Sequence, residues 1–119
     1  MKPVVLGLFL IVMAGSTRLE AHAFLERAEP AVGSTMQASP SEVRVLFTEK
    51  IEPALSSVQV FEASGKEVDK HDLHLDRSNH ALLRISLQPL QVGTYKVVWR
   101  VGSVDTHITK GSFTFRVVR

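Results

Sequence analysis

The sequence predicts an all-β fold, an immunoglobulin-like (cupredoxin-like) Greek-key β-sandwich of about seven strands. Several short segments alternate apolar and polar residues, which is the period-two pattern of half-buried strands. Loops rich in Gly, Pro, Ser or Asn separate these segments, and no segment after residue 21 has a convincing helical pattern. The expected strands are residues 22–28, 42–48, 55–62, 67–76, 81–87, 94–101 and 111–118.

The apolar residues of the expected strands share faces, and these faces predict the core between the two sheets. Residues i and i+2 of a strand project to the same side. Trp99 belongs to the clearest strand, so we expect its ring to pack between the sheets. The other core faces are Val43, Val45 and Phe47; Val58 and Val60; Leu83, Ile85 and Leu87; Tyr95, Val97 and Val101; and Phe113, Phe115 and Val117.

Two local features refine this pattern. Phe24 is the expected buried anchor of the first strand. Pro53 is expected to interrupt the chain before the third strand, because proline has no backbone N–H to donate to a sheet.

The segment 67–76 is polar, and we expect it to form an edge strand that carries His71 and His74. These two histidines are three residues apart, a spacing that suits a helix better than a strand, so solvated side chains are favoured over a second metal site. The sequence leaves a second ion at this pair open. The acidic residues of the segment are expected to keep an edge soluble or to form a docking face; they are Glu67, Asp69, Asp72 and Asp76.

The first 21 residues are predicted to be a cleaved secretory signal peptide. Lys2 supplies a positive charge, and residues 4–14 form an apolar core of 11 residues. This core is shorter than the roughly 20 residues that span a membrane. Cleavage after Ala21 would make His22 the first residue, whereas cleavage after Ala23 fits the small-x-small rule better and removes the histidine.

The remaining chain, residues 22–119, is predicted to be one domain of 98 residues. It carries 12 basic and 11 acidic side chains without a basic patch, so nucleic acid is not an expected partner. No second apolar stretch is long enough to span a membrane. The chain contains no cysteine, so it has neither disulfides nor thiolate ligands for a metal.

A candidate metal site is suggested by Asp105 and His107, which are two residues apart between two expected strands. In an extended segment both side chains would face the same point. The alternative is a surface loop without a metal. In a sandwich, the start of the first strand can lie beside the loop that precedes the last strand, which would bring His22 to this pair.

The donors of such a site are nitrogen and carboxylate oxygen, a combination that suits Cu(II). Zinc accepts similar donors but prefers a tetrahedron. Cu(I) prefers sulfur ligands, and Met36 is the only methionine after the signal, so a methionine-lined Cu(I) site is not expected. Because the ligands must be deprotonated, we expect binding to weaken on acidification.

Several stretches of the chain resemble the CopC family of periplasmic copper-resistance proteins: the opening His22 to Leu25, Pro30, Gly33, the strand at 95–100 and the segment 103–113. The D-x-H-x-x-x-G-x-F spacing joined to an N-terminal histidine is the specific part of this resemblance.

The resemblance implies a small β-sandwich that binds Cu(II) through His22, Asp105 and His107, and it favours cleavage after Ala21. Two positions depart from the family pattern, since Thr106 stands where glycine is common and Ile108 where proline is common. The methionine-rich loop of some members is missing.

The predicted function is therefore a periplasmic protein that binds one Cu(II) per chain and sequesters it or delivers it, with an inner-membrane copper transporter as a candidate partner. No enzymatic activity is expected. The first alternative is a copper-dependent oxidase or monooxygenase with an N-terminal histidine brace. The second is an immunoglobulin-like interaction module without a metal.

Overall fold

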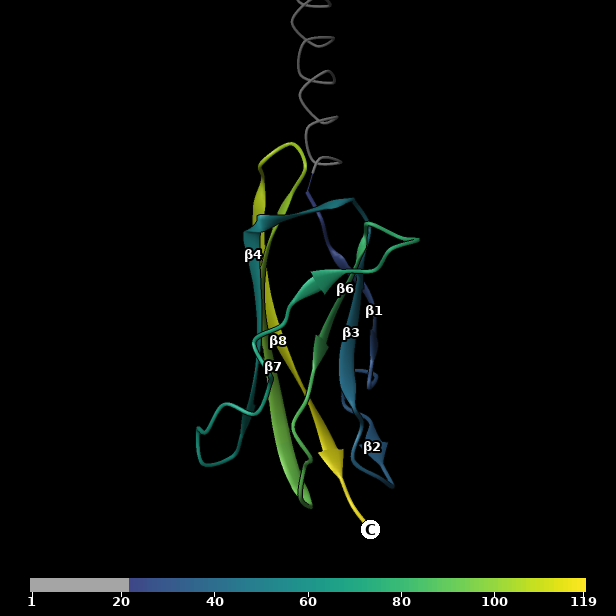
Figure 1. Cartoon of the computed structure of the whole chain (residues 1–119), viewed down its shortest axis with the longest axis vertical. Helices are drawn as coiled ribbons and strands as arrows, with labels where there is room; N and C mark the ends of the chain where they lie inside the picture. Colours follow the sequence, from purple (N-terminus) through teal and green to yellow (C-terminus); the bar gives the residue numbers. More distant parts are fainter. Residues whose placement is uncertain (1–21) are drawn as a thin grey trace, which may run out of the picture.

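The computed structural model describes residues 22–119, so the expected signal peptide at 1–21 lies outside the described residues. Two four-stranded sheets pack face to face (Figure 1), and the prediction of an all-β sandwich is confirmed. Residues 22–119 contain no helix able to cross a membrane. There are eight strands: β1 (Leu25–Glu29), β2 (Thr35–Met36), β3 (Glu42–Phe47), β4 (Ile51–Glu62), β5 (His74–Leu75), β6 (Leu82–Ser86), β7 (Gly93–Ser103) and β8 (Ile108–Val117).

One sheet has the strand order β1-β3-β6-β5 and the other the order β2-β8-β7-β4. All pairs are antiparallel except β2 with β8. The longest hairpin joins β7 to β8, whose register runs from Gly93 opposite Val117 to Gly102 opposite Ile108. Figure 1 shows its turn at the same end of the sandwich as the purple start of the described chain. This arrangement brings residues distant in sequence to one end of the fold.

The predicted core faces are confirmed. Alternate residues of β3, β6, β7 and β8 are buried between the sheets, because each strand turns its apolar side inward. Trp99 is buried, and its ring meets Phe47 edge-on with ring centroids 5.2 Å apart. Such aromatic contacts add to the free energy gained by removing apolar surface from water.

The expectation for Phe24 is wrong: this side chain is 54% exposed, and its neighbour Ala23 is buried instead. The strand begins only at Leu25, and the backbone at Phe24 is held by hydrogen bonds to Thr48. The Phe24 N–H donates to Thr48 Oγ1 at 2.9 Å, and the Thr48 N–H donates to the Phe24 carbonyl at 2.9 Å. These bonds set which side of the segment faces inward.

The expectation for Pro53 is also wrong, because β4 begins before it at Ile51. The pairing of β4 with β7 shifts register between Glu52 and Ser57, and Pro53 lies in this irregular stretch. A bulge leaves residues outside the regular ladder, so the missing N–H is tolerated there.

The polar segment 67–76 differs from the expected edge strand, since only His74 and Leu75 form a strand. Glu67 and Asp69 make isolated bridges to Phe61 and Leu87. Asp69 is 1% exposed, so the expectation that it is a solvated edge residue is wrong.

Gly111 lies opposite Trp99 in the hairpin, and a Cβ atom added there would lie 2.6 Å from Trp99 Cζ2. We therefore expect Gly111→Ala to lower the free energy of unfolding by about 1–3 kcal/mol, because the indole cannot move without disturbing Phe47. Urea unfolding measures the change, with Ser112→Ala at the exposed neighbouring position as the control. Equal stability of Gly111→Ala and the wild type would contradict this account of the packing.

Candidate metal centre

His22 and His107 come from opposite ends of the described chain and lie side by side. Their ring centroids are 4.7 Å apart, and the ring planes are inclined by 42°. His107 Nδ1 is 3.6 Å from Asp105 Oδ1. The structure thus places His107 beside both His22 and Asp105, while the role of these three residues as metal ligands stays a prediction.

The first residues are held against the end of the β7–β8 hairpin by a side-chain hydrogen bond. Thr109 Oγ1 donates to the Ala23 carbonyl at 2.6 Å. Thr109 is two residues beyond His107, and Ala23 is the residue after His22. The bond therefore holds the backbone that follows His22 against the strand that follows His107.

Asp105 and His107 lie in a tight turn rather than in an extended segment, so the expected reason for their proximity is wrong. The Thr106 N–H donates to the Ser103 carbonyl at 2.8 Å, and the Ser103 N–H donates to the His107 carbonyl at 3.0 Å. Thr106 has a φ of 75°, in the left-handed region that glycine adopts most easily. This is the position where the family resemblance leads one to expect glycine.

Asp105 is oriented by a second hydrogen bond inside the turn. The buried Ser103 hydroxyl donates to Asp105 Oδ1. This bond and the neighbouring His107 imidazole lower the pKa of Asp105, because both favour the ionised carboxylate. The side chain is therefore an anion over the whole neutral range and is available to a cation.

The three side chains combine two imidazoles with a carboxylate, and two of them are accessible from solvent. The side chains of His107 and Asp105 are 48% and 51% exposed. Nitrogen and oxygen donors of this kind suit Cu(II) or Zn(II).

Met36 of β2 is partly buried and packs against the core, which gives this methionine a structural role.

Three exposed apolar side chains are sequence neighbours of the candidate site residues. Phe24 lies next to His22, with ring centroids 6.2 Å apart. Val104 and Ile108 flank the Asp105–His107 turn in sequence, and both are exposed. We call Phe24, Val104 and Ile108 the apolar rim.

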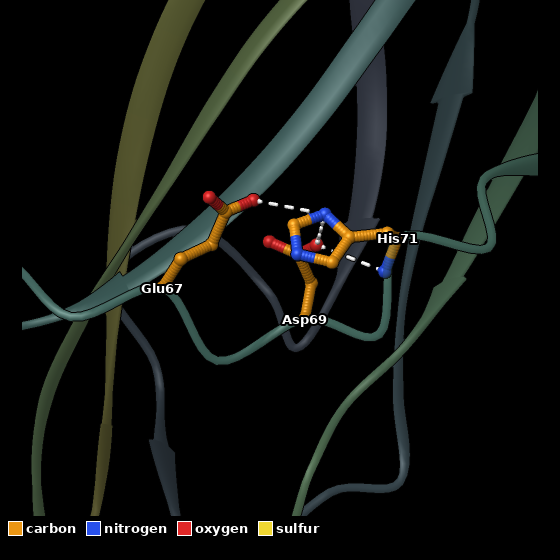
Figure 2. A group of neighbouring side chains, drawn as sticks. All are labelled: Glu67, Asp69 and His71. Atoms are coloured by element: carbon orange, nitrogen blue, oxygen red, sulfur yellow. Dashed lines mark hydrogen bonds and ion pairs between the residues drawn. The ribbon is translucent and has the colours of Figure 1, made fainter.

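The remaining histidines do not form the pair considered from the sequence. His74 Nδ1 lies 2.8 Å from the Asp72 carbonyl, and His80 is exposed in a turn. His71 instead lies against Glu67 and Asp69, as Figure 2 shows. The i, i+2, i+4 spacing of these three residues is the sequence pattern that points to a shared side, whereas the three-residue spacing of His71 and His74 does not.

Comparison with known proteins identifies the family of this chain. Residues 25–118 match the family model described as the CopC domain. The chain belongs to the CopC family. Among curated relatives, copper resistance protein C of Xanthomonas campestris pv. juglandis is 32% identical over 117 residues, covering 90% of this chain and 91% of the relative. Protein YobA of Escherichia coli K12 is 32% identical over 98 residues, which are 82% of this chain and 79% of the relative.

Solved structures of CopC proteins have the same fold. CopC from Methylosinus trichosporium OB3b is 34% identical with a TM-score of 0.71, covering 81% of this chain and 93% of that one. PcoC, a methionine-rich copper resistance protein from Escherichia coli, is 28% identical with a TM-score of 0.73, covering 82% and 100%. These relationships connect this CopC chain with copper resistance.

The effect of Ser103 on Asp105 can be measured in the metal-free CopC domain. We expect Ser103→Ala to raise the pKa of Asp105 toward its ordinary value, because the carboxylate loses the hydroxyl donor. The group is then protonated at a higher pH, so any stability that depends on its ionised form is lost earlier as the pH falls. A carboxyl carbon NMR titration measures the shift.

Asp76 is the internal control for this titration, since its pKa is lowered separately by Ser78 and Arg84. An unchanged Asp105 pKa in Ser103→Ala would show that the hydroxyl does not control the carboxylate.

Proposed function

We propose that this chain is a periplasmic Cu(II)-binding protein that holds one ion per chain and sequesters it or transfers it in copper resistance, without catalysis. The observation that supports this most directly is the contact between His22 and His107 beside Asp105 in a chain of the CopC family. Two imidazoles and an ionised carboxylate match the donors that Cu(II) prefers. Copper also heads the divalent affinity series.

We further propose that residues 1–21 are a secretory signal removed after Ala21. His22 would then supply its α-amino group as well as its imidazole, giving four donors from two segments. Removal of two further residues would eliminate this ligand, so the position of cleavage determines whether the site exists.

The exposure of the site favours transfer of the ion to a partner. A competing ligand can reach Asp105 and His107 from solvent and displace the donors one at a time. The apolar rim offers a surface for contact around the ion, and exposed apolar groups of this kind commonly contribute to protein–protein interfaces. We propose an inner-membrane copper transporter as the partner.

Copper binding is tested by equilibrium dialysis of the exported protein against Cu(II) at neutral pH. We expect one tightly bound equivalent. Loss of an outer-sphere partner already costs about 10–100-fold in metal affinity, so His22→Ala and His107→Ala should each weaken the tight site by at least about 100-fold. Affinity should also fall as the pH is lowered, because protons compete for the nitrogen donors.

His80→Ala is the matched control, since it removes an exposed imidazole from a turn outside the site. If His22→Ala and His107→Ala both bind the first equivalent as tightly as the wild type, the assignment of the site is wrong.

The start of the exported chain is tested by intact-mass spectrometry of protein recovered from the periplasm. We expect a mass that corresponds to residues 22–119. A chain that begins at Phe24 would lack the first donor and contradict the proposed Cu(II) site, and a protein that is absent from the periplasm would contradict the localisation.

A further inference from the structure

Glu67, Asp69 and His71 form a second group of metal-binding side chains on the segment that follows β4. One ligand atom from each residue lies within 4.8 Å of the others. Figure 2 shows the His71 ring turned toward both carboxylates. Nothing in the CopC assignment or in the proposed Cu(II) site uses these residues.

We propose that Glu67, Asp69 and His71 form a second metal site, which binds a divalent transition-metal ion through two carboxylate oxygens and one imidazole nitrogen.

Two of the three distances between the donors match those around a small cation. His71 Nδ1 is 3.5 Å from Glu67 Oε2 and 3.3 Å from Asp69 Oδ1. Donors about 2.1 Å from a tetrahedral ion are about 3.4 Å from one another. An ion therefore needs only small adjustments of these side chains.

Asp69 is preorganised as a ligand by the backbone. The Val60 N–H donates to Asp69 Oδ2 at 2.8 Å, and the His71 N–H donates to Oδ1 at 3.1 Å. The carboxylate is 1% exposed, and burying an anion without a counter-charge is costly. Among the ion pairs of residues 22–119, His71 is the only basic partner of Glu67 or Asp69, and no Lys or Arg reaches them.

Glu67 adds a further observation to the geometry of the group. Its Oε2 atom is buried without a hydrogen-bond partner, although it faces the imidazole. A bound cation would supply a partner for Oε2.

His71 is the third member of the group, and its backbone has an unusual conformation. Its φ is 57°, in the left-handed region that few residues other than glycine adopt. In this conformation the His71 imidazole lies beside the carboxylates of Glu67 and Asp69. The three residues line a surface hollow of about 300 Å³, which leaves room for water to complete the coordination of an ion.

The second site is separate from the proposed Cu(II) site. Val60, which binds Asp69, pairs with Val97 of β7, whereas Ser103 of β7 binds Asp105. Val97 and Ser103 are six residues apart, which is about 20 Å along a strand. The two groups of donors therefore cannot share one ion.

The donor set selects a class of ion. Two oxygens and one nitrogen without sulfur suit Zn²⁺ or Cu²⁺, and Cu²⁺ stands higher in the affinity series. With three donors and no α-amine, the site should bind copper more weakly than the proposed N-terminal site. In the wild type it would accept a second, weaker equivalent.

The test uses the exported protein carrying His22→Ala and His107→Ala, which removes two donors of the first site. Zn²⁺ alone and Cu²⁺ alone are titrated by calorimetry. We expect one saturable equivalent of at least one of the two ions. Adding Glu67→Gln or His71→Asn should weaken this binding at least about tenfold. Asparagine tolerates the left-handed conformation, so His71→Asn removes the imidazole with little backbone change.

His80→Ala in the same background is the control and should bind as the parent does. His71 is exposed, so His71→Asn remains informative even if Glu67→Gln fails to fold. The proposal is overturned if the parent double variant binds neither ion, or if both added substitutions leave its binding unchanged. Neither result bears on the first equivalent of copper, which is measured with His22 and His107 intact.

Discussion

The hydrogen bond from Thr109 Oγ1 to the Ala23 carbonyl joins two segments on which the proposed Cu(II) site depends. The His107 and Asp105 side chains belong to a hairpin turn, whereas His22 precedes the first strand of the opposite sheet. A bond of this type contributes only about 0.5–1.5 kcal/mol, and the paired Phe24–Thr48 contacts add two more. Together these bonds hold the otherwise unpaired start of the chain beside a rigid hairpin, so the donors meet without a continuous strand to align them.

Much of the fold follows from the alternation of residue types. The inward faces of β3, β6, β7 and β8 agree with the pattern because the sandwich buries one side of each strand. Phe24 and Pro53 could not be assigned in this way. Their environments are set by hydrogen bonds to Thr48 and by an irregular pairing of β4 with β7, and both depend on contacts between segments that local sequence does not specify.

The two groups of donors differ in what sequence alone could predict. The D-x-H spacing led to Asp105 and His107, but their proximity comes from a turn with Thr106 in a left-handed conformation rather than from strand geometry. The polar neighbours of Asp69 predict a solvated residue. Its burial depends on the Val60 N–H, a partner nine residues away that only the folded β4 presents. A buried carboxylate of this kind is visible only once the tertiary contacts are known.

The burial of Ala23 also constrains the order of maturation. A protease holds an extended stretch of chain on both sides of the bond that it cuts, and such stretches must be accessible. In the folded domain the residue two positions after Ala21 is packed in the core and bonded through its carbonyl to Thr109. If residues 1–21 are a leader removed after Ala21, as proposed, the cut would have to come before this segment docks, so the α-amino group and imidazole of His22 would reach the hairpin only after cleavage.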